Sequence, residues 1–313
     1  MNYGDLIRDA YRITLHNRFL WFFGFFAGGT GTNFVGNVPS GGGNFNFDDF
    51  QRSDAGLTAQ VGQGLSETVL ILGIVVVVLL IALFFIILAI ISQGALADSV
   101  AAMDRGEGRR FGSAFSSGTG NFWRVLGYYV VFFLIALGLL MVIAIPVALL
   151  IGGTFAATQS TGARISVAVV VGILAVLLLI VIFIPLSIIG QYALRDIVVR
   201  RERVLGSVGS GYGLFRHNIG RSLLLWLIQL GLSIGIGIAF ILLLLIVGLI
   251  LALPAIGLAV AGYTTAAIIA AVIAGLILLP ILLVATGAIG TFSHAYWTLA
   301  YLRLTTEATP RVV

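Results

Sequence analysis

The stretch Thr68–Ser92, TVLILGIVVVVLLIALFFIILAIIS, is the part of the sequence that decides the fold. Its 25 residues contain no charged side chain, and a second charge-free run, Ile165–Ala193, is 29 residues long. A helix needs about 20 consecutive apolar residues to cross the hydrocarbon core of a bilayer. Both runs are therefore predicted to be transmembrane helices.

The rest of the 313-residue chain has the same character, with 60% hydrophobic and 9% charged residues. A soluble domain usually carries about 25% charged residues. The sequence contains no cysteine, which excludes disulfides, thiolate nucleophiles and cysteine-based metal sites. The net charge of +5 does not indicate a nucleic-acid binder, because basic loops are the rule on the cytoplasmic side of a membrane protein. The composition predicts a single all-α integral membrane domain over residues 1–313.

The apolar runs predict about six transmembrane helices. Their ranges are 19–38, 67–92, 125–151, 165–190, 222–252 and 264–292. The first differs from the others, because its apolar core Phe19–Ala27 is only nine residues long and several glycines follow it. No charge occurs from Phe19 through Phe47, so a full crossing is allowed, and a partly re-entrant segment is the alternative.

The arginines set the expected orientation. Fifteen of the 17 arginines fall before the first span, between spans two and three, between spans four and five, or after the sixth. Only Arg52 and Arg164 fall on the other side. Since cytoplasmic loops are enriched in arginine, both termini are predicted to be cytoplasmic. A cleavable signal peptide at residues 1–30 is the less favoured alternative, because Asp5 and Asp9 lie in a helical pattern before the apolar core.

Local matches along the chain predict three repeat units of roughly 100 residues. Ala95–Val100 and Ala193–Val198 share four of six residues at a spacing of 98. Three further pairs share an offset of 201: Tyr11 with Tyr212, His16 with His217, and Asn17 with Asn218. Asn121 stands before the third span in a context similar to that of Asn218. The units are predicted at about 1–107, 107–205 and 205–313, each made of a short amphipathic helix and two spans.

The short amphipathic helices are predicted to lie at the membrane surface. In the first, Tyr3, Leu6 and Ala10 share one face, and charged residues occupy the other. Such helices lie in the plane of the lipid headgroups with their apolar face inward. Two roles stay open: setting the entry angle of the next span, which is favoured, or recognising anionic lipid through nearby arginines.

These features give the chain a resemblance to known proteins. The three helical hairpins, the Gly112-Ser113 and Gly206-Ser207 pairs and the segment Phe215–Arg221 resemble bacterial six-helix inner-membrane proteins of the YciC type. They also resemble the membrane domain fused to some glycerophosphodiester phosphodiesterases. The resemblance implies a fold and a location in a bacterial inner membrane. It implies no activity, because catalysis in those fused proteins belongs to a separate soluble barrel. This chain has no room for such a barrel, since its longest polar loop runs only from about 28 to 66.

Two acidic residues are the most interesting candidates for a site. Asp98 and Asp196 follow spans two and four in matching sequence contexts. The arginines considered with them are Arg109, Arg110, Arg200 and Arg201. The favoured interpretation is a structural salt bridge at a hydrated membrane interface. A lipid-headgroup site or a proton site is the alternative.

No catalytic, cofactor or metal site is predicted. The histidines His16, His217 and His294 lack metal-ligand spacing. The spans carry no ionisable residue away from their ends, which argues against a proton relay. Gln229 is expected to hydrogen-bond to a neighbouring helix, and the pattern Gly24-xxx-Gly28 is expected to allow close approach of two helices.

Three functions are compatible with this sequence. The leading hypothesis is a non-enzymatic scaffold or accessory subunit of a membrane assembly, with membrane lipids and other membrane proteins as partners and no nucleic acid. The second is a permease or lipid-handling protein with an apolar cavity between the repeats. The third is a membrane enzyme that acts on lipid headgroups through Asp98, Asp196 and nearby arginines.

Overall fold

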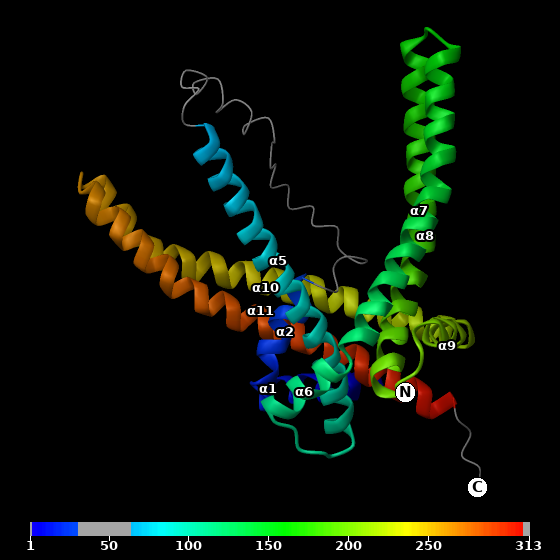
Figure 1. The fold of residues 1–313 in the computed structure, drawn as a ribbon, viewed down its shortest axis with the longest axis horizontal. Coiled ribbons are helices and arrows are strands. Elements are labelled where there is room, and N and C mark those ends of the chain that lie inside the picture. Colours follow the sequence, from blue (N-terminus) through cyan, green and yellow to red (C-terminus); the bar gives the residue numbers. More distant parts are fainter. Residues whose placement is uncertain (1, 31–63, 309–313) are drawn as a thin grey trace.

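The computed structural model describes residues 2–30 and 64–308, and every regular element within them is a helix (Figure 1). The shorter helices are α1 (Tyr3–His16), α2 (Leu20–Thr30), α6 (Phe111–Gly120) and α9 (Val204–His217). The longer helices are α5 (Gly64–Asp104), α7 (Phe122–Ala157), α8 (Thr161–Val199), α10 (Ile219–Val260) and α11 (Thr264–Ala308). The all-α architecture predicted from the sequence is confirmed for this part of the chain.

The five longer helices are all long and apolar enough to cross a membrane. Each contains one of the predicted spans two to six, and each has between 36 and 45 residues. About 20 residues suffice for a crossing, so the helices continue well past the predicted membrane boundary. Of the predicted first span, 19–38, the structure describes α2 as far as residue 30, and residues 31–38 lie outside the described part.

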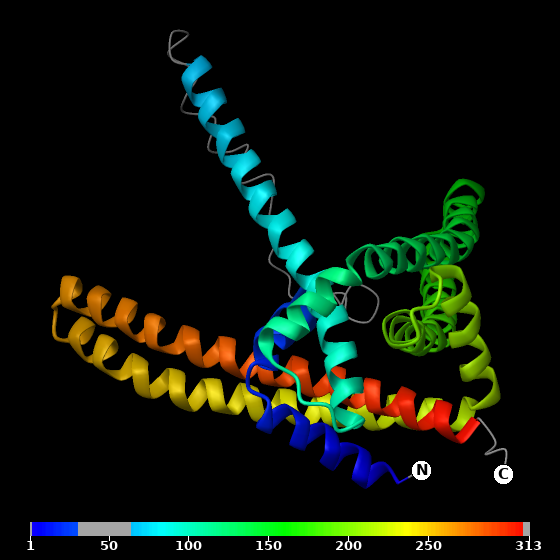
Figure 2. The ribbon, with the colours of Figure 1, turned by 60° about the horizontal axis from the view of Figure 1, so that its bottom comes forward.

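The longer helices form two hairpins and a single arm that diverge from a shared base (Figures 1 and 2). α7 and α8 make one hairpin, α10 and α11 make the other, and α5 extends alone. Gly262 has a φ of 86° in the turn between α10 and α11, a conformation that favours glycine. The arms expose rows of aliphatic side chains, and Val181 and Leu276 are each 67% exposed. Apolar surface of this extent is typical of helices that face lipid.

The base is built around the C-terminal ends of α5, α8 and α11. Its fully buried side chains include Leu96, Ala97, Val100, Tyr192, Leu194, Ile197, Ala295, Tyr296, Leu299 and Ala300, all at most 2% exposed. Side-chain amides connect this core to its neighbours. Gln93 Nε2 of α5 donates to the carbonyl of Ala27 in α2 at 2.8 Å. Gln229 Nε2 of α10 donates to Ser293 Oγ of α11 at 3.0 Å, so the predicted bond from Gln229 to a neighbouring helix is confirmed.

Three short helices complete the base by packing against the ends of the longer helices. α6 lies against α5, α9 against α8, and α1 against α11. A Cβ atom at Gly118 of α6 would lie 2.4 Å from the Ile91 carbonyl oxygen, and one at Gly211 of α9 would lie 2.9 Å from the Ile189 carbonyl oxygen. These two contacts require glycine, because any side chain would push the backbones apart. On α1 the contact residue Ala10 is fully buried.

The same three helices end in the same way. Their C-caps are asparagines, whose Nδ2 atoms donate to the carbonyl four residues earlier: Asn17 to Ile13 at 3.0 Å, Asn121 to Ser117 at 3.0 Å and Asn218 to Leu214 at 3.3 Å. Such bonds satisfy carbonyls that a helix end leaves without a partner. The predicted repeat mates Asn121 and Asn218 therefore occupy the same local position, although the repeat units themselves stay a prediction.

α2 crosses α11 at a pair of glycine sites. A Cβ at Gly24 would lie 2.2 Å from the Gly287 carbonyl oxygen, and a Cβ at Gly290 would lie 2.1 Å from the Gly24 carbonyl oxygen. A Cβ at Gly28 would lie 2.8 Å from the Gly290 Cα. The close approach predicted for Gly24-xxx-Gly28 is confirmed, and its partner is the last helix of the same chain.

Candidate functional site: three recesses at the base

Three recesses open at the base, and each lies beside one of the short helices. Their volumes are about 630 Å³ beside α6, 550 Å³ beside α9 and 530 Å³ beside α1. We refer to them as the α6, α9 and α1 recesses. Charged and hydroxyl side chains gather in all three, which makes them the candidate sites in the described part of the chain.

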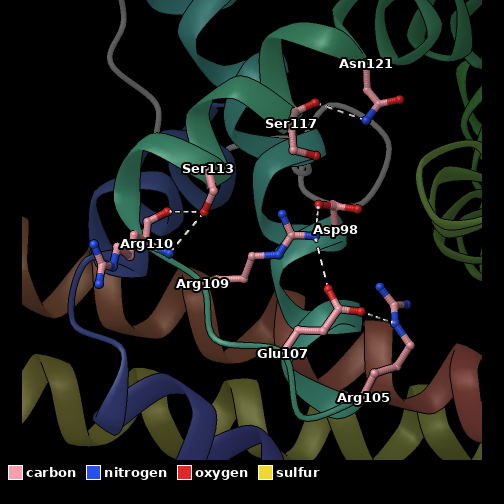
Figure 3. A network of polar contacts seen from close by, with 8 residues as sticks. All are labelled: Asp98, Arg105, Glu107, Arg109, Arg110, Ser113, Ser117 and Asn121. Carbon is pink, nitrogen blue, oxygen red and sulfur yellow. Dashed lines mark hydrogen bonds and ion pairs between the residues drawn. The ribbon is translucent and has the colours of Figure 1, made fainter.

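The α6 recess is built on ion pairs between α5 and the loop that follows it (Figure 3). Arg109 Nη2 lies 3.0 Å from Asp98 Oδ2 and 3.8 Å from Glu107 Oε2. Arg105 Nε donates to Glu107 Oε1 at 2.8 Å, and this bond holds the pKa of Glu107 below its usual value. The network fixes the loop against α5, so Asp98 makes the kind of salt bridge that its interfacial position suggested.

Arg110, predicted as a member of the site, has a different place. It is the N-cap residue of α6, and Ser113 Oγ accepts a hydrogen bond from its backbone amide at 3.1 Å and donates one to its carbonyl at 2.8 Å (Figure 3). The Arg110 side chain is exposed and lines none of the three recesses. Its neighbour Arg109 is the loop residue that enters the α6 recess.

Arg124 of α7 and Arg201 of the α8–α9 loop complete the α6 recess. Within the described residues, neither side chain makes an ion pair or a hydrogen bond. Arg201 has a φ of 57°, in the left-handed region that costs a non-glycine residue about 1–2 kcal/mol. Trp123, at the start of α7, also lines the recess and is 78% exposed. With Arg109 there are three arginines against Asp98, an excess of two positive charges suited to an anion.

The α9 recess contains the second predicted acid, Asp196, which is only 2% exposed. The sequence suggested a hydrated carboxylate, and this is wrong, because α8 continues past the predicted span and carries Asp196 into the base. Tyr301 Oη of α11 donates to Asp196 Oδ1 at 2.6 Å, and Arg200 Nε lies 3.8 Å from the same oxygen. Asp196 therefore connects α8 to α11 and lies within ion-pair distance of Arg200.

The α1 recess is acidic. Its charged residues are Asp5, Arg8, Asp9, Asp104 and Arg303. Arg8 Nη2 pairs with Asp5 Oδ1 at 3.0 Å, and Arg303 Nη2 pairs with Asp9 Oδ2 across the junction of the first and last helices. No group of three residues suited to holding a metal ion occurs in the described part of the chain.

The three histidines lie on three different helices. His16 Nδ1 lies 3.0 Å from the Arg12 carbonyl oxygen, and His217 Nδ1 lies 2.8 Å from the Gly213 carbonyl oxygen. Both are exposed residues at the ends of short helices, while His294 is 2% exposed inside α11. The first two thus have the same local role, as partners of a carbonyl near a helix end.

Sequence reasoning missed Arg195, which it counted among the arginines of a cytoplasmic loop. The side chain is fully buried in α8, and its Nη1 donates to the Gln191 carbonyl at 3.0 Å. Its Nε and Nη2 have no partner among the described residues. The repeat match did contain a signal, since Arg195 aligns with Ala97, an apolar residue that is also fully buried.

The model of a family of unknown function, DUF7544, matches residues 19–309 of this chain. No curated protein matches the chain, and no solved structure matches it.

Proposed function

We propose that this chain, which belongs to the DUF7544 family of unknown function, is a non-enzymatic integral membrane protein that serves as a scaffold or accessory subunit of a membrane assembly. The five membrane-spanning helices and the compact base are its two working parts. The base holds the helices together, and the arms present apolar faces to partners within the bilayer.

One observation carries this proposal: close-packed side chains fill the centre of the base. The ends of α5, α8 and α11 meet there, and Leu96, Arg195 and Tyr296 are each 0% exposed. A closely packed core fixes the positions of the three arms relative to one another, because a packed interior resists deformation. A permease needs a route for its solute, so the tight packing of these side chains supports the scaffold over that alternative.

The charge distribution of the arms supports the same proposal. The ranges 71–97, 125–157, 165–194, 222–260 and 264–293 contain no Asp, Glu, Arg, Lys or His. Ionisable groups inside a membrane mark proton relays and ion pathways. Arms of this composition are suited to contact with lipid chains and with other apolar helices.

We further propose six crossings, with both termini on the cytoplasmic side of a bacterial inner membrane. The five described spans are an odd number, yet α1 and the end of α11 lie together at the base, joined by Asp9 and Arg303. A chain whose two ends lie on one side of a membrane crosses it an even number of times, which supports a further crossing between α1 and α5. The arginines at the base support the cytoplasmic assignment.

The order of elements supports three repeat units as part of this proposal. A short helix begins each predicted unit, and each short helix ends at an asparagine cap. The resemblance to six-helix membrane proteins of the YciC type is likewise part of the proposal. It agrees with this order of elements and implies no activity.

A site-specific photo-crosslinker tests the scaffold role. We expect a photoreactive residue at Val181 or Leu276, both exposed on the arms, to capture a distinct membrane protein in intact cells. The same group at Arg110, exposed at the base, is the control for non-specific capture. Flux of a solute or lipid through the purified protein in vesicles, with no captured partner, would contradict the scaffold and favour the permease.

A further inference from the structure

The α6 recess differs in charge from the other two recesses of the base. Three arginines and one aspartate line it. The α9 recess has one arginine and one aspartate, and the α1 recess has two arginines and three aspartates. Electrostatics therefore favours an anion in the α6 recess and disfavours one in the α1 recess.

The arginines of the α6 recess fall into two classes. Arg109 is held by Asp98 at 3.0 Å, so the carboxylate neutralises this arginine and fixes its position. Arg124 and Arg201 make no ion pair within the described residues. Their guanidinium groups keep all of their donors for a ligand, and a guanidinium fits a phosphate through two parallel hydrogen bonds.

Two further features give the recess the character of a binding site. Hydroxyl groups of Ser116 and Ser117 line its wall on α6. Arg201 has the left-handed backbone conformation, φ 57°, while its side chain makes no hydrogen bond or ion pair within the described residues. Strained residues of this kind cluster at ligand sites, where the strain positions a side chain for its partner.

The sequence beside the recess is typical of the headgroup level of a membrane. Trp123 and Arg124 line it, and the charge-free run of α7 begins with the next residue, Val125. Tryptophan and arginine are the side chains that mark the boundary between hydrocarbon and water. A phosphate bound here would be at the right level to belong to a lipid whose chains run along α7.

We propose that the α6 recess binds the phosphate group of an anionic phospholipid through Arg124 and Arg201, with Arg109 held in place by Asp98. The lipid is favoured over free phosphate by the position of the recess at the start of a span. The site adds a lipid ligand to the molecule and does not depend on the scaffold role.

The test uses the full-length protein in detergent, with phosphatidylglycerol and phosphatidylcholine as probes. Native mass spectrometry counts the lipids retained at each concentration. We expect the double variant Arg124→Gln/Arg201→Gln to lower the affinity for phosphatidylglycerol by about tenfold or more and to leave the affinity for phosphatidylcholine unchanged, since both unpaired arginines that would bind the phosphate are removed. The matched control is Arg110→Gln/Arg203→Gln, which removes two exposed arginines of neighbouring loops that do not line the recess.

A second measurement uses the native chain. A photoactivatable phosphatidylglycerol should label peptides within 109–124 and around 201, and melting temperatures show that the variants are folded. Equal loss of lipid in the control variant would reduce the site to general surface charge and overturn the proposal. Displacement of the lipid by millimolar inorganic phosphate, with retention of the phosphate, would keep the recess as a phosphate site but overturn the lipid assignment.

Discussion

At the scale of single residues, the base depends on polar contacts between helices that are far apart in the sequence. Asp196 and Tyr301 are 105 residues apart, and Asp9 and Arg303 are 294 apart. The sequence predicted Asp98 and Asp196 to be structural acids with arginine neighbours, and they lie 3.0 Å from Arg109 and 3.8 Å from Arg200, respectively. It could not indicate Tyr301, because no local pattern connects the ends of α8 and α11.

Tyr301→Phe tests the bond to the buried carboxylate. The change removes the hydroxyl that donates to Asp196 at 2.6 Å and leaves the carboxylate with Arg200 at 3.8 Å. We expect a loss of about 1–3 kcal/mol in the free energy of unfolding, the cost of a buried acceptor without its donor. Thermal unfolding in detergent measures it. Tyr263→Phe is the control, since Tyr263 is 65% exposed, and an equal loss there would contradict the role of this bond.

Arg201→Gly tests the strained backbone of the α6 recess. Glycine adopts a φ of 57° without the cost that arginine bears. We expect a net gain of about 0.5–1 kcal/mol in the free energy of unfolding, after allowance for the more flexible unfolded chain. The variant should also retain less phosphatidylglycerol. Arg203→Gly, at a residue with a φ of −71°, should bring no gain, and equal gains at both positions would show that strain is not the cause.

At the scale of elements, the five described spans could be located from the sequence, because charge-free runs of this length have few alternatives. The ends of these helices could not be located from the sequence. The runs end near Ser92, Ala193 and Ser293, but α5, α8 and α11 continue to Asp104, Val199 and Ala308. Charged residues stopped the sequence-based spans, whereas in the structure the same residues are on helical extensions that build the base. The helix that packs against α2 could not be predicted either, because a pattern of small residues does not identify its partner helix.

Gly290→Ala tests the crossing of α2 and α11. The new Cβ would lie 2.1 Å from the Gly24 carbonyl oxygen, so the two helices must separate. We expect a loss of about 2 kcal/mol or more in the free energy of unfolding. Gly275→Ala on the same helix has nothing within 4 Å of its Cβ and should be neutral or stabilising by up to about 1 kcal/mol. Similar melting temperatures for the two variants would contradict the close crossing.

At the scale of the whole molecule, the arms and the base divide the two requirements of a membrane protein. The arms present apolar side chains that are compatible with the lipid chains of the bilayer. The base supplies close packing between helices, because the hydrophobic effect does not drive apolar helices together within lipid. The closing of the base by α1 against α11 was not predictable from local patterns, because it joins the two ends of the sequence.

Cysteine labelling tests the arrangement of the molecule across the membrane. The chain has no native cysteine, so Ser210→Cys on α9 and Gln159→Cys in the α7–α8 turn can be labelled without background. We expect impermeant reagents to reach them from opposite sides. Tyr11→Cys on α1, where Tyr11 is 58% exposed, should label from the same side as Ser210→Cys. If Tyr11→Cys were labelled from the same side as Gln159→Cys, the proposed even number of crossings would be contradicted.

The contact of α1 with α11 also has a consequence for biosynthesis. α1 leaves the ribosome long before the segment that covers its apolar face, around Ala300 and Leu304, has been made. While the spans are inserted, α1 therefore stays on the membrane surface with Leu6 and Ala10 facing the lipid, because an amphipathic helix is stable there. The assembly of the base can finish only after α11 has been made, so a chain stopped before α11 is complete would keep α1 on the bilayer, available to whatever recognises unfinished membrane proteins.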